Sequence, residues 1–311
     1  MMDRDNDRFD FVVTDEYEGI RIDKLISELI ESLSRTYIKK LIDEKKVLCN
    51  GKNVKASFIV SDGDVIEMEI PPVEVPEIVP EDIPLDILYE DNDLIIVNKP
   101  KDMVVHPAAG HYSGTLVNAV MFHCRDNLSG INGVLRPGIV HRIDKDTTGS
   151  VIICKNDASH QKIAEQLKEH SITRVYHAIC YGIIAEDELD IDAPIGRSSI
   201  DRKKMAVVSS GGKNAFTHIK VLKRFENDGF TYVECRLKTG RTHQIRVHMA
   251  HIGHPLLGDE VYASGRKSRF KLQGQCLHAK TLGFIHPVSG EYIEIDAPLP
   301  EYFSHLIEVL K

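Results

Sequence analysis

Apolar residues follow two different periods along the chain, and the first of them is helical. Over residues 22–33 they fall on one stripe of a helix. Ser34 is placed to cap a second helix over 35–45, because a serine hydroxyl there accepts a hydrogen bond from the first helical turn. Asn50-Gly51 between apolar runs then predicts a hairpin. This order of elements predicts a compact unit over 21–70.

The pattern changes beyond a proline-rich segment. Residues 71–84 hold five of the chain's 13 prolines, interleaved with acidic residues. Such a composition favours a stiff, extended spacer that takes no part in a core. The chain is therefore expected to divide into an N-terminal domain over 1–75, a linker over 76–84 and a larger domain over 85–311.

Short apolar runs separated by turns follow from residue 85 onward. Two segments are expected to be helical, one over 157–169 with Asp157 as its cap and one that begins at Thr242. The expected strands are 87–89, 94–97, 151–154, 174–181, 215–223 and 231–238. Strands and helices mix without the regular spacing of parallel βαβ units. This predicts an α+β domain around a mixed, mostly antiparallel sheet.

The formal charge of −8 is unevenly distributed over the 311 residues. Residues 61–93 hold 12 acidic and no basic side chains, whereas 21–55 hold 9 basic and 5 acidic ones. Because phosphate binding depends on the local field, the acidic total does not exclude an RNA partner. No apolar run approaches the ~20 residues that span a bilayer, and the N-terminus lacks the order of a signal peptide. A cytoplasmic protein without a membrane partner is expected.

Basic side chains gather on the predicted helix over 35–45, opposite its apolar stripe. They are Arg35, Lys39, Lys40, Lys45 and Lys46. A row of charges is often only a solvated surface, and this remains the alternative. With the hairpin that follows, segment 21–70 resembles the S4 RNA-binding domain. The resemblance implies that these five side chains contact RNA.

Residues 138–149, Gly-Ile-Val-His-Arg-Ile-Asp-Lys-Asp-Thr-Thr-Gly, crowd polar and charged groups between two apolar strands. A loop held in this way by a rigid sheet is a common place for a functional site. Asp144 lies there among cationic residues and offers a nucleophile or a base. The alternative is a capped turn in which Asp144 and Asp146 accept backbone hydrogen bonds.

This segment resembles the signature of the RluA family of pseudouridine synthases, His-Arg-Leu-Asp-x-x-Thr-Ser/Thr-Gly. Ile143 and Thr148 are the two departures from its commonest form, and both are conservative. Further blocks match the family in order: 98–100, 105–107, 173–178, 240–248, 254–259, 277–279 and 286–290. The resemblance covers about 20–311. With the S4-like unit, the chain looks most like the RluD-type enzymes of large-subunit ribosomal RNA.

The family resemblance implies roles for individual residues. Asp144 would be the catalytic nucleophile at the junction of sugar and base, and Arg246 the cation that keeps this carboxylate charged. Tyr176 would lie against the flipped uracil, where an aromatic face stacks on a base. Arg142 would fill the gap that the extruded nucleotide leaves in the RNA. The same blocks place three further residues among the RNA contacts: His141, Arg241 and His243.

Two other groups of residues allow more than one interpretation. Arg202 and Lys203 lie in a basic loop and are interpreted as phosphate contacts, with a solvated loop as the alternative. The histidines at 243, 248, 251 and 254 suggest a metal site, but no Asp-x-x-His or His-Glu-x-x-His pattern accompanies them. Because pseudouridine formation is redox-neutral, the resemblance implies neither a metal nor any other cofactor.

The sequence thus predicts a uridine isomerase that acts as a monomer on ribosomal RNA, either in the large subunit or in its assembly precursor. The alternatives are a non-catalytic S4-type RNA-binding protein, a synthase acting on tRNA, and a glycosidase-type hydrolase that uses Asp144 with Asp146. Carboxylates two positions apart on an extended chain point to opposite faces, which suits a paired-carboxylate hydrolase poorly. Asp144, Tyr176 and Arg246 occur together, which argues against a non-catalytic protein.

Overall fold

The computed structural model describes residues 8–30, 33–71, 78–107, 112–125, 128–131, 136–201, 204–266 and 268–311. The chain forms two compact units, Met1–Val75 and Pro76–Lys311. Each unit has a hydrophobic core of its own. Among the described residues, no helix is both long enough and apolar enough to cross a membrane.

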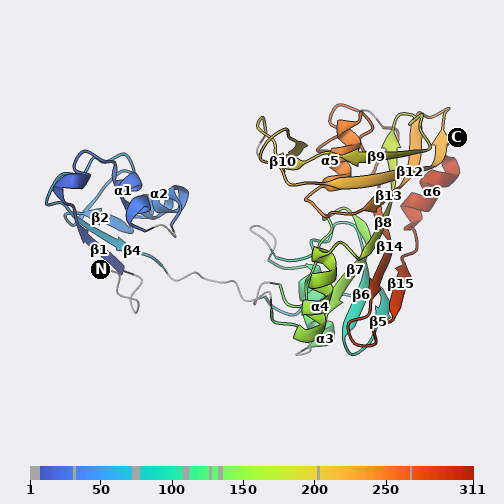
Figure 1. Cartoon of the computed structure of the whole chain (residues 1–311), viewed down its shortest axis with the longest axis horizontal. Coiled ribbons are helices and arrows are strands. Elements are labelled where there is room, and N and C mark those ends of the chain that lie inside the picture. The colour runs from blue at the N-terminus through green and yellow to red at the C-terminus, as the bar shows by residue number, and fades with distance from the viewer. Residues whose placement is uncertain are drawn as a thin grey trace. The chain divides into compact units, whose positions relative to one another are not determined.

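The N-terminal unit combines two helices with a small antiparallel sheet (Figure 1). Its elements are β1 (Arg8–Val12), the 3-10 turn η1 (Asp15–Tyr17), α1 (Ile22–Leu29), α2 (Arg35–Asp43), β2 (Val47–Cys49), β3 (Lys52–Asn53) and β4 (Val65–Glu69). The strands are ordered β1-β4-β2-β3. Leu25 of α1, Ile38 of α2 and Ile66 of β4 are fully buried in one shared core. Burial of the apolar stripes is therefore what holds the two helices on this unit.

Local sequence signals account for the turns of this unit. The hydroxyl of Ser34 accepts the backbone N–H of Tyr37 at 3.2 Å, so the predicted cap of α2 is confirmed. Asn50 and Gly51 have positive φ angles of 51° and 70°, as a tight hairpin turn requires. The predicted hairpin is confirmed as the antiparallel pair β2–β3.

Both helices are shorter than predicted. α1 ends at Leu29 rather than at residue 33. α2 ends at Asp43, and Lys45 adopts a left-handed φ of 62°. A left-handed residue turns the backbone out of a right-handed helix, so the predicted helix over 35–45 loses its last two residues.

The larger unit is built on a nine-stranded sheet. Its strand order is β5 (Ile87–Glu90), β6 (Leu94–Lys99), β7 (Thr148–Cys154), β14 (Leu277–Ile285), β8 (Thr173–Tyr181), β13 (Phe230–Leu237), β12 (Phe216–Phe225) and β9 (Glu188–Asp192), and β15 (Tyr292–Asp296) pairs with β14. β7 and β14 are parallel, and the other described pairs are antiparallel. A separate hairpin joins β10 (Ile195–Arg197) to β11 (Met205–Val207). The α+β class and the mixed, mostly antiparallel sheet are confirmed.

Helices cover both faces of this sheet (Figure 1). They are α3 (Leu116–Cys124), α4 (Asp157–Lys168), α5 (Gln244–His251) and α6 (Glu301–Val309). Val97 of β6 and Cys180 of β8 lie in one core together with residues of α3 and α5. The residues that precede them in the sequence lie in other cores: Ile96 packs with α4, and Ile179 packs with α6. Since alternate strand residues point to opposite faces, α3 and α5 lie on one face and α4 and α6 on the other.

The proline-rich segment was predicted to be a spacer that takes no part in a core, and this is wrong for part of it. Ile78 is buried in the core of the larger unit. Asn118 of α3 accepts the N–H of Glu81 through its backbone oxygen at 3.0 Å, and its side-chain amide donates to the backbone oxygen of Val79 at 2.8 Å. The carboxylate of Glu81 accepts the N–H of Gly114 at 3.0 Å. The backbone N–H and C=O groups of an extended segment have no hydrogen-bond partners within the segment. Here Asn118 of α3 supplies partners for two of them.

Two predicted helix starts are also corrected. α4 is capped by Asn156, whose side chain accepts the N–H of Ser159 at 2.9 Å, and not by Asp157. Asp157 instead accepts the hydroxyl of Ser129 at 2.7 Å, a contact between distant parts of the chain. α5 begins at Gln244 rather than at residue 242, because the preceding residue is left-handed.

Candidate active site

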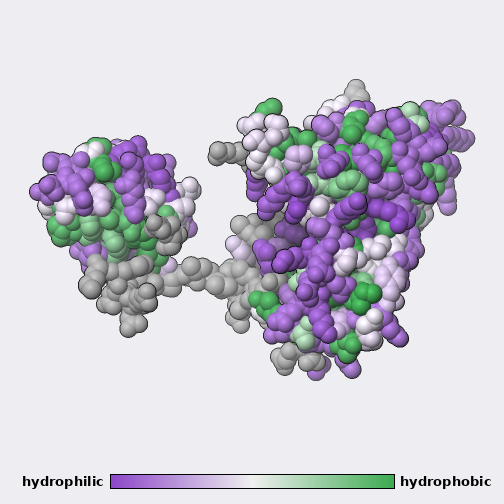
Figure 2. All heavy atoms as spheres, in the orientation of Figure 1, coloured by the Kyte–Doolittle hydropathy of each residue, from purple (hydrophilic) through white to green (hydrophobic). Residues whose placement is uncertain are grey.

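A cleft of about 580 Å³ opens in the larger unit where five segments meet. They are the loop 140–147 before β7, the end of α4 with the turn that follows it, the start of β8, the segment 237–246 from the end of β13 into α5, and the first residue of β14. Hydrophilic side chains cover most of the visible face of this unit (Figure 2). Four of these segments begin or end in a strand of the sheet, so polar side chains on loops are held by a rigid support.

Asp144 and Arg246 meet in this cleft, although they are 102 positions apart in the sequence. Nη1 of Arg246 donates to Oδ2 of Asp144 at 2.9 Å. The arginine side chain is only 7% exposed, while that of the aspartate is 20% exposed. A buried charge is tolerated only when it is paired. The carboxylate of Asp144 is therefore held by the arginine on the protein side and is open toward the cleft.

Asp259 holds the other side of the same guanidinium. Nε and Nη2 of Arg246 donate to its two carboxylate oxygens at 2.6 and 3.0 Å, a bidentate pair. The side chain of Asp259 is fully buried, and Oδ1 also accepts the backbone N–H groups of Val261 and Tyr262. Burial alone would lower the pKa of Arg246, but the carboxylates of Asp259 and Asp144 raise it above its ordinary value. The arginine stays charged and keeps one orientation.

His243 approaches the second oxygen of Asp144, with Nε2 3.8 Å from Oδ1. Its Nδ1 lies 2.9 Å from the hydroxyl of Tyr262, and that hydroxyl accepts the backbone N–H of Met205 at 3.1 Å. A hydroxyl that accepts this N–H can still donate its own hydrogen to Nδ1, which would place the ring hydrogen of a neutral His243 on Nε2. Burial lowers the pKa of His243, which favours the neutral ring next to this carboxylate.

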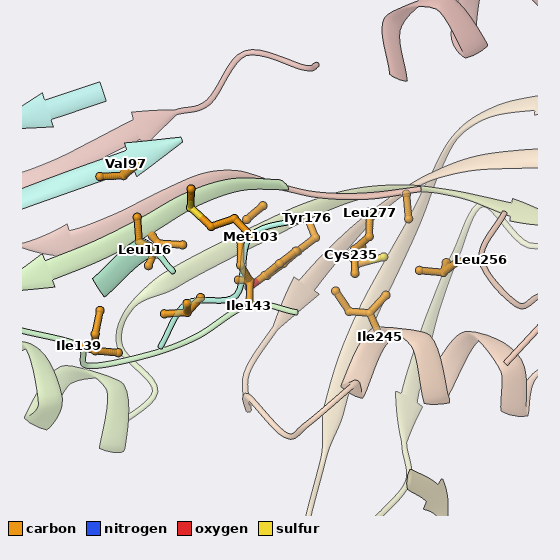
Figure 3. Close-up of a cluster of buried hydrophobic side chains, with 14 of the residues drawn as sticks. Val97, Met103, Leu116, Ile139, Ile143, Tyr176, Cys235, Ile245, Leu256 and Leu277 are labelled. Carbon is orange, nitrogen blue, oxygen red and sulfur yellow. The ribbon is translucent and has the colours of Figure 1, made fainter. Parts of the chain in front are cut away.

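Tyr176 forms an apolar wall of the cleft. It lies on β8, on the face of the sheet that α3 and α5 cover. Figure 3 shows its ring beside Ile143 in the hydrophobic cluster that also includes Leu277, and both of these residues line the cleft. The side chain is buried, and burial raises the pKa of its hydroxyl. The structure thus places all three predicted catalytic residues at one cleft.

Lys99 supports the loop that carries Asp144. Its side chain is fully buried, and Nζ donates to the backbone oxygens of Pro100, Met103 and Lys145 at 2.7, 2.9 and 2.9 Å. Burial lowers the pKa of Lys99 to about 7. An ammonium group has three donors, and all three are used here. The third one fixes the backbone next to Asp144.

Four of the predicted RNA contacts line the cleft with Asp144: Arg142, Arg241, His141 and His243. Arg142 makes no ion pair within the described part of the chain. Nε2 of His141 accepts the backbone N–H of Ile152 at 3.0 Å, and burial lowers the pKa of this histidine to about 3. His141 is therefore neutral and is held in place by strand β7.

The remaining predicted RNA contacts are distributed differently. Lys39 and Lys45 line a groove of about 570 Å³ in the N-terminal unit, together with Arg21 and Lys55. The other three basic residues of that group form ion pairs: Arg35 with Asp23 at 2.8 Å, Lys40 with Glu44 at 3.6 Å and Lys46 with Glu69 at 2.7 Å. Arg202 and Lys203 lie outside the described residues.

The histidines that suggest a metal have other partners. His248 contacts the hydroxyl of Thr217 and the backbone oxygen of Ala193, both at 2.9 Å. Nδ1 of His254 lies 2.9 Å from the backbone oxygen of Tyr181. Among the described residues, a group with metal-ligand spacing occurs elsewhere, at Asp91, Asp93 and His286. Its central carboxylate, Asp91, already accepts hydrogen bonds from Tyr89, Asp93, Leu94 and His286.

Several residues of this site have no role in the sequence-based prediction. Asp259 and Lys99 lie inside the matched blocks, yet no local pattern indicates which groups they reach. Tyr262 has no sequence signal of its own. Asp146, the second carboxylate of the hydrolase alternative, does not line the cleft, and its side chain packs against Gly274. These contacts arise only when distant segments are brought together.

Comparisons with known proteins identify the family of the chain. The family model described as RNA pseudouridylate synthase matches residues 93–251, and the S4 domain model matches residues 20–66. An uncharacterized RNA pseudouridine synthase of Bacillus subtilis, YlyB, is 49% identical, and the match covers 98% of each chain. The ribosomal large subunit pseudouridine synthase D of Zymomonas mobilis is 47% identical over 96% of each chain. The structure of human RNA pseudouridylate synthase domain containing 1 superposes with a TM-score of 0.56 at 26% identity, covering 73% of this chain and 95% of that one.

Proposed function

The chain belongs to the RNA pseudouridylate synthase family and carries an S4 domain; from this premise we propose that it isomerises specific uridines of large-subunit ribosomal RNA, with Asp144 as the nucleophile. The ion pair between Arg246 and Asp144 is the observation that carries the assignment of the nucleophile. Relatives named for the ribosomal large subunit support the choice of RNA.

The reaction explains why a charged carboxylate is needed. Isomerisation breaks the bond between N1 of uracil and C1′ of the ribose, turns the base and joins C5 to C1′. The hydrogen on C5 is released and N1 gains one, so the composition of the RNA does not change. Asp144 supplies the nucleophile that separates base from sugar. Arg246 pairs with it at Oδ2 and does not occupy Oδ1, the oxygen nearer His243.

The other lining residues hold the extruded nucleotide. A uridine inside a folded RNA reaches Asp144 only after it leaves its stack, at a cost of a few kcal/mol. The ring of Tyr176 gives the uracil a face to stack on. Arg142 has no acidic partner in the described chain and is free to enter the gap that the uridine leaves.

The N-terminal unit would bind RNA through a groove of its own. The groove at Lys39 and Lys45 is basic and is separate from the cleft, which lies wholly in the larger unit. The positive charge of such a groove attracts RNA phosphates electrostatically, independently of the base sequence. We place the protein in the cytoplasm, where ribosomal RNA is assembled, and expect it to act as a monomer.

The test is release of tritium from C5-labelled uridine in RNA transcripts. Wild-type protein is expected to release tritium from large-subunit ribosomal RNA, and transcripts of tRNA serve as the comparison. Asp144→Asn is expected to lower the rate on the order of a thousand-fold or more, because an amide is not a nucleophile. Asp146→Asn is the matched control, since this nearby carboxylate does not line the cleft.

Each result bears on a different part of the proposal. If wild-type protein releases no tritium from any ribosomal RNA, the proposed reaction on this substrate is wrong. Release from tRNA alone would keep the reaction but replace the substrate. Full activity of Asp144→Asn would exclude this residue as the nucleophile.

A further inference from the structure

The cleft has an excess of positive charge that its own residues do not balance. Its described lining holds five arginine and lysine side chains and one carboxylate, that of Asp144. That carboxylate is already paired with Arg246, which has Asp259 as a second partner. The four remaining cations are Arg142, Lys168, Arg174 and Arg241. None of the four makes an ion pair within the described part of the chain.

Arg174 is the most confined of these four cations. It precedes Tyr176 by two positions on β8, so both side chains leave the strand on the same face. Burial lowers the pKa of Arg174, and the neighbouring charge of Arg241 lowers it further. A half-buried arginine beside another arginine is an unfavourable arrangement in the absence of an anion.

The hydrogen bonds of Arg174 are incomplete. A guanidinium has five N–H donors. In the described chain one bond is made, from Nη2 to the backbone oxygen of Lys238 at 3.2 Å. Nε is buried and has no partner. Leaving a buried donor unpaired is unfavourable, so a bound group that accepts from this fork would be stabilised by it.

Gly240 explains how the guanidinium fits. A Cβ on Gly240 would lie 2.6 Å from Nη1 of Arg174, too close for contact. The φ angle of Gly240 lies outside the left-handed region, so its backbone conformation does not require glycine. The absence of a side chain therefore serves to make room for Arg174 at the wall of the cleft.

We infer that Arg174 binds a backbone phosphate of the RNA next to the target uridine, in a space that Gly240 keeps open. This inference rests on the proposed function for its RNA substrate. A phosphate diester carries a negative charge, which would offset the excess positive charge of the cleft. Its oxygens can also accept two hydrogen bonds from one guanidinium. Because Tyr176 lies on the same face of β8, the phosphate held there belongs to the RNA that flanks the flipped base.

The test compares RNA binding with chemistry in the full-length protein. The dissociation constant for a large-subunit ribosomal RNA transcript is measured over a series of salt concentrations in the Asp144→Asn background, and kcat from tritium release in the active background. Arg174→Gln is expected to raise the dissociation constant about ten-fold and to reduce the slope of log K against log salt by about 0.7–0.9. We expect kcat at saturating RNA to stay within about two-fold of wild type, because a phosphate contact acts on binding.

Gly240→Ala provides a second variant without a change of charge. The atom that a methyl group would meet is the end of a flexible side chain, so the protein is expected to fold and to displace the guanidinium. We expect a loss of affinity of about three-fold or more, although the net charge is that of wild type. Arg269→Gln is the matched control, because Arg269 is exposed, pairs with Asp228 and does not line the cleft.

The outcomes separate this inference from the proposed function. A wild-type dissociation constant for Arg174→Gln, or a salt slope equal to that of Arg269→Gln, would overturn it. So would unchanged binding by Gly240→Ala, or a variant of Arg174 that loses kcat and keeps its affinity. If wild-type protein releases no tritium while Arg174→Gln still weakens RNA binding, the proposed function fails and the phosphate contact stands.

Discussion

The two oxygens of Asp144 have different surroundings, and this difference suits a nucleophile. Oδ2 accepts a charged hydrogen bond from Arg246, whereas Oδ1 lies 3.8 Å from Nε2 of His243, beyond hydrogen-bond distance. A carboxylate bonded at both oxygens would be stabilised but less reactive. Here Oδ2 forms the ion pair with Arg246, and Oδ1 remains available to the proposed substrate.

Individual histidines should make the stability of the protein depend on pH. His278 is fully buried, contacts the hydroxyl of Thr148 at 2.8 Å and has a pKa lowered to about 4 by burial. In the unfolded chain its pKa returns to about 6.5. The unfolded state therefore takes up the proton first as the pH falls, and stability present above about pH 6.5 is lost on the way to pH 4.

The expected loss is about 1.4 kcal/mol per pH unit for each such histidine below pH 6.5. Urea unfolding at several pH values measures it, and His278→Gln should flatten the slope by about one proton. His305→Gln is the control, since that side chain is exposed on α6. An equal slope in wild type and His278→Gln would show that this histidine is not the group responsible.

Strand packing determines where the loop that carries Asp144 ends. Gly149 lies on β7 between β6 and β14, with Lys99 and Ala279 as its partners. It has a φ of 107°, and a Cβ there would collide with the backbone of Ala279. Glycine is thus required both by its conformation and by the close approach of β14.

A methyl group at this position should separate the two parallel strands. We expect Gly149→Ala to lower the free energy of unfolding by about 2–4 kcal/mol and to reduce kcat, because the loop with Asp144 is displaced. Ser150→Ala is a control one residue away: its hydroxyl is buried without a partner, so its removal should leave stability unchanged or raised. Chemical denaturation and tritium release measure both variants. Wild-type stability of Gly149→Ala would contradict this account of the glycine.

The molecule as a whole consists of two units with separate cores, and the proposed RNA binding is divided between them. The N-terminal unit has its own core and a basic groove, while the cleft belongs to the larger unit. Ile78 is buried in the larger unit, so removal of residues 1–75 leaves that core complete.

Deletion of 1–75 should therefore preserve folding and chemistry but weaken binding. We expect a dissociation constant at least about ten-fold higher and a smaller dependence on salt, since phosphate contacts are lost. Lys39→Gln combined with Lys45→Gln in the full chain is the matched variant, and it should show part of the same effect. RNA binding at several salt concentrations and tritium release at saturating RNA measure both. A truncated protein that unfolds would show that the larger unit needs the N-terminal one.

Features that depend on neighbours in the chain could be predicted from the sequence. The cap at Ser34, the Asn50-Gly51 hairpin and the apolar stripes depend on contacts within a few residues. The loop around Asp144 was also recognisable, because its motif is continuous. Where a local signal competed with a distant contact, the prediction was wrong. Asp157 accepts a hydrogen bond from Ser129 and does not cap α4, and Ile78 is buried in the core of the larger unit although a spacer was predicted there.

The amino-acid sequence alone was enough to identify the family, the class of fold and the residues Asp144, Tyr176 and Arg246 as candidates. Tertiary structure decided how they meet. Three contacts join segments from different strands and loops. Asp259 accepts hydrogen bonds from Arg246, Lys99 donates to the backbone of the loop that carries Asp144, and Arg174 packs against Gly240. Such contacts have no period or spacing, because each depends on how the sheet brings distant segments together.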